Sequence, residues 1–129
     1  MSKQRRPAKL FLTERARKDI ATIRKYSIEN WGKKTAERYI DDFQSAFDRI
    51  KTHPNLLQSV SNLHESLRFY RVNQHVLVCS VRPQATIVVS VFHGRMDVAS
   101  KLSELSPTLE DEVDLLISKL HQKTRRRKH

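Results

Sequence analysis

The chain has 129 residues and a mass of 15.2 kDa, which is enough for one domain with a core of its own and too little for two. No apolar run approaches the roughly 18 residues that a membrane-spanning helix needs, and no charged-then-apolar leader opens the chain. The single cysteine, Cys79, excludes an internal disulfide and a cysteine zinc cluster. We therefore expect a cytoplasmic protein with no cofactor and no metal. Cys79 is expected to be an inert side chain that packs among apolar neighbours.

The net charge of +11 is distributed unevenly along the chain. Nine of the 25 lysines and arginines lie in residues 1–9 and 123–128, and neither segment holds an acidic residue. The other 16 cations nearly balance the 14 acidic residues. Most of the basicity is thus predicted to lie on segments that flank the fold.

The first predicted elements are a short strand and a long helix. Residues 9–12 favour a strand, and Thr13 followed by Glu14 is typical of a helix N-cap with an acidic residue in the first turn. We expect this helix from about Glu14 to Trp31, with Gly32 as its end. Its apolar stripe, at steps of three and four residues, consists of Ala16, Ile20, Ile23, Ser27 and Trp31.

A second amphipathic helix is predicted from about Lys34 to Thr52, and Pro54 prevents its continuation. The two helices, joined at Gly32, form an antiparallel hairpin. The buried face of the second helix is expected to consist of Ala36, Tyr39, Ile40, Phe43, Phe47 and Ile50.

The hydrophobic period changes after the polar stretch 58–66. Three strands are predicted at 67–72, 75–81 and 86–93, because these segments are rich in β-branched and aromatic residues and are separated by turn residues. Short connections make them an antiparallel meander. Their apolar residues point to both faces, so the sheet is expected to be covered on both faces.

A C-terminal helix is predicted over about 107–121, with Ser106 as its N-cap and Pro107 at its first position. The segment 104–114 holds five acidic residues and no cation. The stripe of this helix consists of Leu109, Val113, Leu116, Ile117 and Leu120. Two interpretations remain open: the helix closes the chain's own core, or the second sheet face or this helix receives a segment of a partner.

At this point the residues resemble the ParE, or plasmid-stabilisation, branch of the RelE/ParE superfamily of bacterial toxins. The resemblance covers about Leu10 to Leu102. It rests on Leu12-Thr13, Ala16, Asp19-Ile20, Tyr26, Trp31-Gly32, Ala36, Tyr39, Phe43, Pro54, Leu67-Arg68, His75-Val76, Phe92-His93 and Met96-Asp97.

The expected fold is α+β, in the order β-αα-βββ. It has an N-terminal strand, a two-helix hairpin packed on a mostly antiparallel four-stranded sheet, a short C-terminal helix and an appended helix. Met96 and Asp97 are expected to begin the short helix. We expect a toxin domain at residues 1–102 and an extension at 103–129, with a basic tail at 122–129.

The resemblance implies the toxin of a type II toxin–antitoxin system that inhibits DNA gyrase by binding, without a catalytic set. It also implies a cognate, ParD-like antitoxin, an acidic and partly disordered chain that neutralises the toxin. The predicted sheet region has a basic excess that fits such a partner. Candidate residues for binding the target or the antitoxin are Arg68, Arg71, Arg82, His93, Arg95 and Asp97.

The superfamily also contains ribosome-dependent mRNA interferases, so RNA cleavage is the alternative activity. Cleavage needs a group for proton transfer and cations for the developing phosphorane charge, which Arg71, Arg82 and His93 would supply. The RNA-cleaving members add a tyrosine or a second acid–base group near the end of the last strand. Here Gly94 and Arg95 follow His93, which argues against cleavage.

The basic tail gives a third hypothesis, of a non-toxic relative that binds nucleic acid or protein. Its cations could contact phosphates without reading bases, and the alternative is a solvated terminus that aids solubility. These cations are Lys123, Arg125, Arg126, Arg127 and Lys128.

Overall fold

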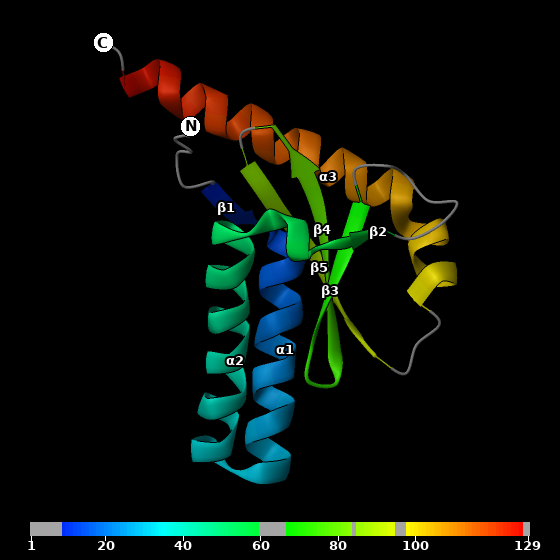
Figure 1. The fold of residues 1–129 in the computed structure, drawn as a ribbon. Coiled ribbons are helices and arrows are strands. Elements are labelled where there is room, and N and C mark those ends of the chain that lie inside the picture. The colour runs from blue at the N-terminus through cyan, green and yellow to red at the C-terminus, as the bar shows by residue number, and fades with distance from the viewer. Residues whose placement is uncertain (1–8, 60–66, 84, 95–97, 128–129) are drawn as a thin grey trace.

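A helix hairpin, a mixed sheet and one long helix form the protein (Figure 1). The structure is a computed structural model, and it describes residues 9–59, 67–83, 85–94 and 98–127. Within these ranges no helix has the length and apolar character that crossing a membrane requires. The elements in chain order are β1 (Lys9–Leu12), α1 (Glu14–Trp31), α2 (Lys33–Thr52), a 3-10 turn (Pro54–Leu56), β2 (Gln58–Ser59), β3 (Leu67–Val72), β4 (His75–Arg82), β5 (Ala85–His93) and α3 (Val98–Arg127).

The hairpin forms as the sequence predicts, with both helices within one residue of their expected ends. Thr13 caps α1, because its Oγ1 accepts a hydrogen bond from the Ala16 N–H at 3.2 Å. Gly32 is the single residue between α1 and α2, and its φ of 90° lies in the region of backbone conformation that favours glycine. Trp31, however, is 54% exposed and does not continue the buried stripe. The tip of the hairpin extends past the end of the sheet, so no strand lies beneath it (Figure 1).

The sheet has the order β1-β5-β4-β3-β2, with β1 parallel to β5 and the other pairs antiparallel. The α+β class is confirmed, but the sheet has five strands and not four. The missed strand is β2, whose two residues are polar and exposed. It is defined only by its pairing with Arg68 and Phe69 of β3, so no local sequence pattern predicts it.

Both faces of the sheet are covered, as its apolar pattern predicts. The hairpin packs on one face, in a core that includes Phe43, Ile50, Leu77 and Val88. On the other face α3 contributes the second core together with the strands, and this settles the open question in favour of a helix that closes the chain's own core. The second core consists of Leu67, Val78, Ile87, Val89, Phe92, Leu102, Leu109 and Val113.

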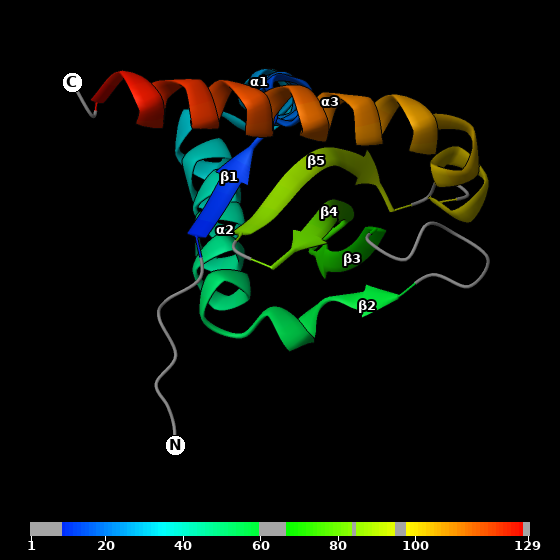
Figure 2. The ribbon, with the colours of Figure 1, turned by 90° about the horizontal axis from the view of Figure 1, so that it is seen from above.

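The short helix and the appended helix that the sequence predicts are joined into one, α3, with Pro107 inside it. The first turns run in a different direction from the rest (Figure 1), as expected where proline removes a backbone hydrogen bond. Leu102, Leu109 and Val113 are fully buried on both sides of Pro107. Their common apolar stripe offsets the local cost of the proline and keeps both halves of the helix on the sheet (Figure 2).

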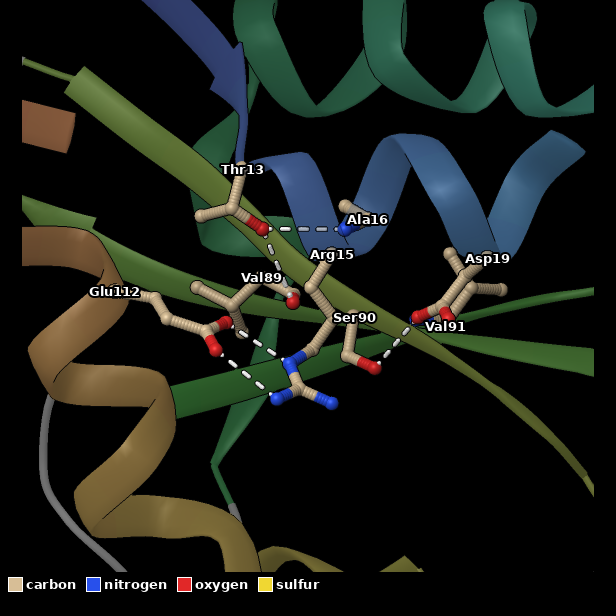
Figure 3. A network of polar contacts seen from close by, with 8 residues as sticks. All are labelled: Thr13, Arg15, Ala16, Asp19, Val89, Ser90, Val91 and Glu112. Carbon is tan, nitrogen blue, oxygen red and sulfur yellow. Dashed lines mark hydrogen bonds and ion pairs between the residues drawn. The ribbon is translucent and has the colours of Figure 1, made fainter.

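A β-bulge in β5 is held by a side chain of α1. The β4–β5 register shifts between Val78 and Cys79, so Val89 has no partner in β4. Beside it, Asp19 Oδ2 accepts hydrogen bonds from Ser90 Oγ at 2.8 Å and from the Val91 N–H at 3.0 Å (Figure 3). The carboxylate of α1 thus provides the acceptor for the Val91 N–H and the Ser90 hydroxyl.

Candidate functional site

The β3–β4 turn and the end of β5 bring two histidines together. His75 is paired with His93 across β4 and β5, and their ring centroids are 5.2 Å apart. On the helix side, the Tyr39 hydroxyl lies 2.6 Å from His75 Nδ1. Tyr39 comes from α2, so this sheet end joins the hairpin to the strands through a tyrosine–histidine contact.

Tyr39 and His75 are both neutral near pH 7. Burial lowers the pKa of His75, and the neighbouring His93 lowers it further. Burial raises the pKa of Tyr39; a backbone hydrogen bond from Gln74 opposes this shift, and the Asp42 carboxylate adds to it. The contact between the Tyr39 phenol and the His75 imidazole therefore links α2 to β4.

Arg71 lies at this same end of the sheet. A Cβ placed on Gly94 would be 2.7 Å from Arg71 Nη1 and 2.9 Å from the Gln74 carbonyl oxygen, so the guanidinium lies directly against Gly94. The Gly94 N–H also donates to that carbonyl, at 2.7 Å. The structure therefore brings Arg71 next to the end of β5, where His93 is exposed.

Arg82 lies elsewhere. It ends β4, seven residues after His75, which corresponds to about 23 Å along a strand. Its guanidinium donates to Glu110 Oε1 at 2.9 Å and lies 3.6 Å from Asp114 Oδ1, both in α3. The predicted set of Arg71, Arg82 and His93 is therefore not assembled at one place, and Arg82 is used to bind α3.

The other predicted residues are distributed as follows. Arg68 pairs with Cys79 on the hairpin side of the sheet, and its buried Nε has no hydrogen-bond partner among the described residues. Arg95 and Asp97, like Met96, lie outside the described residues. The backbone of the cationic segment continues α3 as far as Arg127, and Lys128 lies outside the described residues.

An ion pair that the sequence does not predict fixes α3 to the hairpin. Arg15 donates from Nε and Nη2 to the two carboxylate oxygens of Glu112, both at 2.9 Å (Figure 3). This bidentate geometry lies beside a cleft of about 570 Å³ between α1 and α3. The two residues are 97 positions apart, so only the acidic character of 104–114 gave a signal.

Neither metal binding nor thiol chemistry finds support in the described part of the chain. There, no three histidine, cysteine, aspartate or glutamate side chains lie close enough to hold a metal ion. Cys79 is fully buried, and burial raises the pKa of its thiol to about 12. Such a thiol is protonated and inert at neutral pH.

Comparison with known proteins assigns the fold. The family model of the ParE toxin of type II toxin–antitoxin systems, parDE, matches residues 10–98, which end where α3 begins. The chain is 29% identical over 94 residues to Toxin ParE of Escherichia coli, covering 72% of this chain and 91% of the relative. It is 30% identical over 91 residues to Toxin ParE1 of Caulobacter vibrioides, covering 70% and 94%.

Solved structures agree with the sequence comparison at the level of the fold. The chromosomal ParDE system of P. aeruginosa contains a chain that superposes with a TM-score of 0.59 at 12% identity, covering 67% of this chain and 96% of that one. The toxin–antitoxin complex RelBE2 of Mycobacterium tuberculosis gives a TM-score of 0.54 at 14% identity, covering 70% and 94%. The chain therefore belongs to the ParE toxin family of type II toxin–antitoxin systems, within the RelE/ParE superfamily.

Proposed function

We propose that this protein inhibits DNA gyrase by binding and is neutralised by a cognate antitoxin. The observation that carries the proposal is the family match over residues 10–98, which spans β1 to β5 and both helices of the hairpin. Inhibition by binding needs complementary surface and no reacting group. It therefore does not require a reaction at His75, whose pKa is lowered by burial and by His93 and whose ring contacts Tyr39.

The separation of the arginines supports binding over RNA cleavage. A cleavage site would gather cations around one phosphate, whereas Arg82 is paired with Glu110 and lies about 20 Å along the strands from Arg71. Arg71 and His93 remain together at the other end. The mRNA interferase therefore stays as the second candidate, supported by these two residues alone.

The antitoxin half of the proposal rests on the relatives. The chain from P. aeruginosa comes from a ParDE toxin–antitoxin system, and the M. tuberculosis structure is a toxin–antitoxin complex. For this chain we propose the same kind of partner. Its net charge of +11 favours an acidic polypeptide, which the field of the protein would attract at low ionic strength.

A supercoiling assay with purified gyrase tests the target. We expect the full-length protein at micromolar concentration to inhibit supercoiling and to accumulate cleaved DNA. Absence of both effects would contradict the proposal. Cutting of mRNA on translating ribosomes, lost in Arg71→Ala or His93→Ala, would establish the second candidate instead. Induction in cells gives an independent measurement, since a toxin arrests growth and co-expression of its antitoxin restores it.

The C-terminal cations are proposed to add non-specific binding to nucleic acid. Replacement of Arg125, Arg126 and Arg127 by glutamine is expected to reduce the salt dependence of DNA binding. The slope of the logarithm of the binding constant against the logarithm of the salt concentration should fall in magnitude by about one for each phosphate that is no longer neutralised. An unchanged slope would show that this segment only aids solubility.

A further inference from the structure

Two large aromatic side chains are exposed together at the tip of the helix hairpin. Tyr26 is 57% exposed and Trp31 is 54% exposed, and both belong to the last turns of α1. Their rings meet edge to face with centroids 5.9 Å apart. Trp31 also lies 6.3 Å from the ring of Tyr39, which holds it from the side of α2. The tip thus presents a fixed aromatic pair to solvent.

Three exposed lysines lie next to this pair along the chain. Lys25 precedes Tyr26, and Lys33 and Lys34 begin α2 directly after the turn at Gly32. All three are exposed, and none takes part in the ion pairs that the structure shows among the described residues. Glu29 is the only acidic residue in the segment 25–34. The tip therefore has a net positive charge around an apolar centre.

Neither feature contributes to the core. The hairpin extends beyond the sheet, and its tip lies at the end of the molecule away from α3 (Figure 1). Exposed tryptophan and tyrosine at a rigid position are typical of the residues that provide most of the binding energy at protein interfaces. The neighbouring lysines are charged groups of the kind that occupy the polar rim of such interfaces.

We infer that the hairpin tip, formed by Lys25, Tyr26, Trp31, Lys33 and Lys34, is a docking surface for an acidic polypeptide segment that carries apolar side chains. Carboxylates of the segment pair with the lysines, and an apolar side chain covers the exposed rings. We take this segment to be part of the antitoxin, and only this assignment rests on the proposed function. The chemistry of the surface, cationic around an aromatic pair, is independent of that name.

Synthetic polymers test this chemistry without an identified partner. The probe is a random copolymer of L-glutamate and L-tyrosine, with poly-L-glutamate as the probe for charge alone and oligo(dT) as the nucleic-acid probe. Trp31 is the only tryptophan of the chain, so its fluorescence reports binding at the tip. We expect the copolymer to change this fluorescence, to bind more tightly than poly-L-glutamate, and to lose affinity as salt increases.

Matched variants separate the tip from the overall charge. Tyr26→Ala is expected to weaken copolymer binding about tenfold, as is typical of an interface hot spot, whereas Leu115→Ala, which removes a side chain that is also 57% exposed but lies in α3, leaves it unchanged. Lys33→Gln with Lys34→Gln is expected to weaken it several-fold more than Lys18→Gln with Lys119→Gln, which removes the same charge beside the α1–α3 cleft.

Two results would overturn the inference. One is equal binding by the tip variants and their controls. The other is tighter binding of oligo(dT) than of the copolymer with the same dependence on Tyr26, which would make the tip a nucleic-acid surface. The proposed function is judged separately, by growth arrest and gyrase inhibition of the unmodified protein, so a failure of either proposal can be told from a failure of the other.

Discussion

Asp19 in α1 accepts a hydrogen bond from the backbone N–H of Val91 in β5, at 3.0 Å, and this contact joins the hairpin to the irregular part of that strand. The same carboxylate oxygen accepts from Ser90 Oγ at 2.8 Å. Both groups are near the bulge, where the ladder to β4 is interrupted. One side chain thus satisfies two polar groups that folding removes from water.

Asp19→Ala is expected to lower the free energy of unfolding by about 1–3 kcal/mol, because it leaves the Val91 N–H and the Ser90 hydroxyl without their acceptor. Urea unfolding followed by circular dichroism measures the change. Asp41→Ala, at an exposed position of α2, is the control and is expected to change the stability by less than about 0.5 kcal/mol. Equal effects of the two substitutions would contradict the role of Asp19.

Leu109→Ala tests whether α3 is an integral layer of the fold. Leu109 is fully buried between α3 and the sheet, so its truncation is expected to cost about 2–5 kcal/mol. Leu115→Ala, on the exposed side of the same helix, is expected to cost less than about 0.5 kcal/mol. If Leu109→Ala unfolded with the midpoint of the unmodified protein, α3 would not be packed on the sheet in solution.

His75 should make the fold less stable in mild acid. Its pKa in the folded state is lowered by burial and by His93, whereas the unfolded chain has the ordinary value of about 6.5. As the pH falls below about 6.5, the unfolded state binds this proton first, so the free energy of unfolding decreases until the lower folded-state pKa is passed.

A His75→Gln variant is therefore expected to lose less stability than the unmodified protein between pH 7 and about pH 5.5, as measured by thermal unfolding at both values. His53→Gln, in the exposed segment after α2, is the control for histidine titration in general. The same pH dependence in all three proteins would show that His75 is not perturbed.

Cys79 provides a probe of core opening. Because its side chain is fully buried and its pKa is raised to about 12, a thiol reagent such as DTNB at pH 8 is expected to leave the native protein unlabelled for as long as the core stays closed. Labelling should become complete in denaturant. Rapid labelling without denaturant would contradict the packing of the first core.

Local sequence signals were sufficient for much of the fold. Thr13, Gly32 and Pro54 act on the few residues next to them, so the ends of α1 and α2 could be predicted to within one residue. The strands of the meander follow from runs of β-branched and aromatic residues. Because these runs are apolar toward both faces, the need for a second cover could also be predicted, although its source could not.

The candidate site was predicted only in part. For the alternative of RNA cleavage, the sequence predicts that His93 could meet Arg71 or Arg82, and Arg71 and His93 do lie at one end of the sheet. Arg82 instead binds Glu110 of α3, because sequence spacing does not say which acidic residues will lie opposite a side chain. Tyr39 and His75 are in contact at that end of the sheet. The sequence predicts Tyr39 on the buried face of its helix, but no local pattern pairs it with His75.

The sequence by itself determined the order and ends of most elements, because capping, turns and hydrophobic period depend on residues within a few positions of one another. Only the tertiary structure decided the parallel pairing of β1 with β5, the two-residue strand β2 and the ion pair of Arg15 with Glu112. These features depend on which distant segments pack together. The same holds for α3, since its continuity past Pro107 is favoured by burial of one apolar stripe on a sheet that must first form.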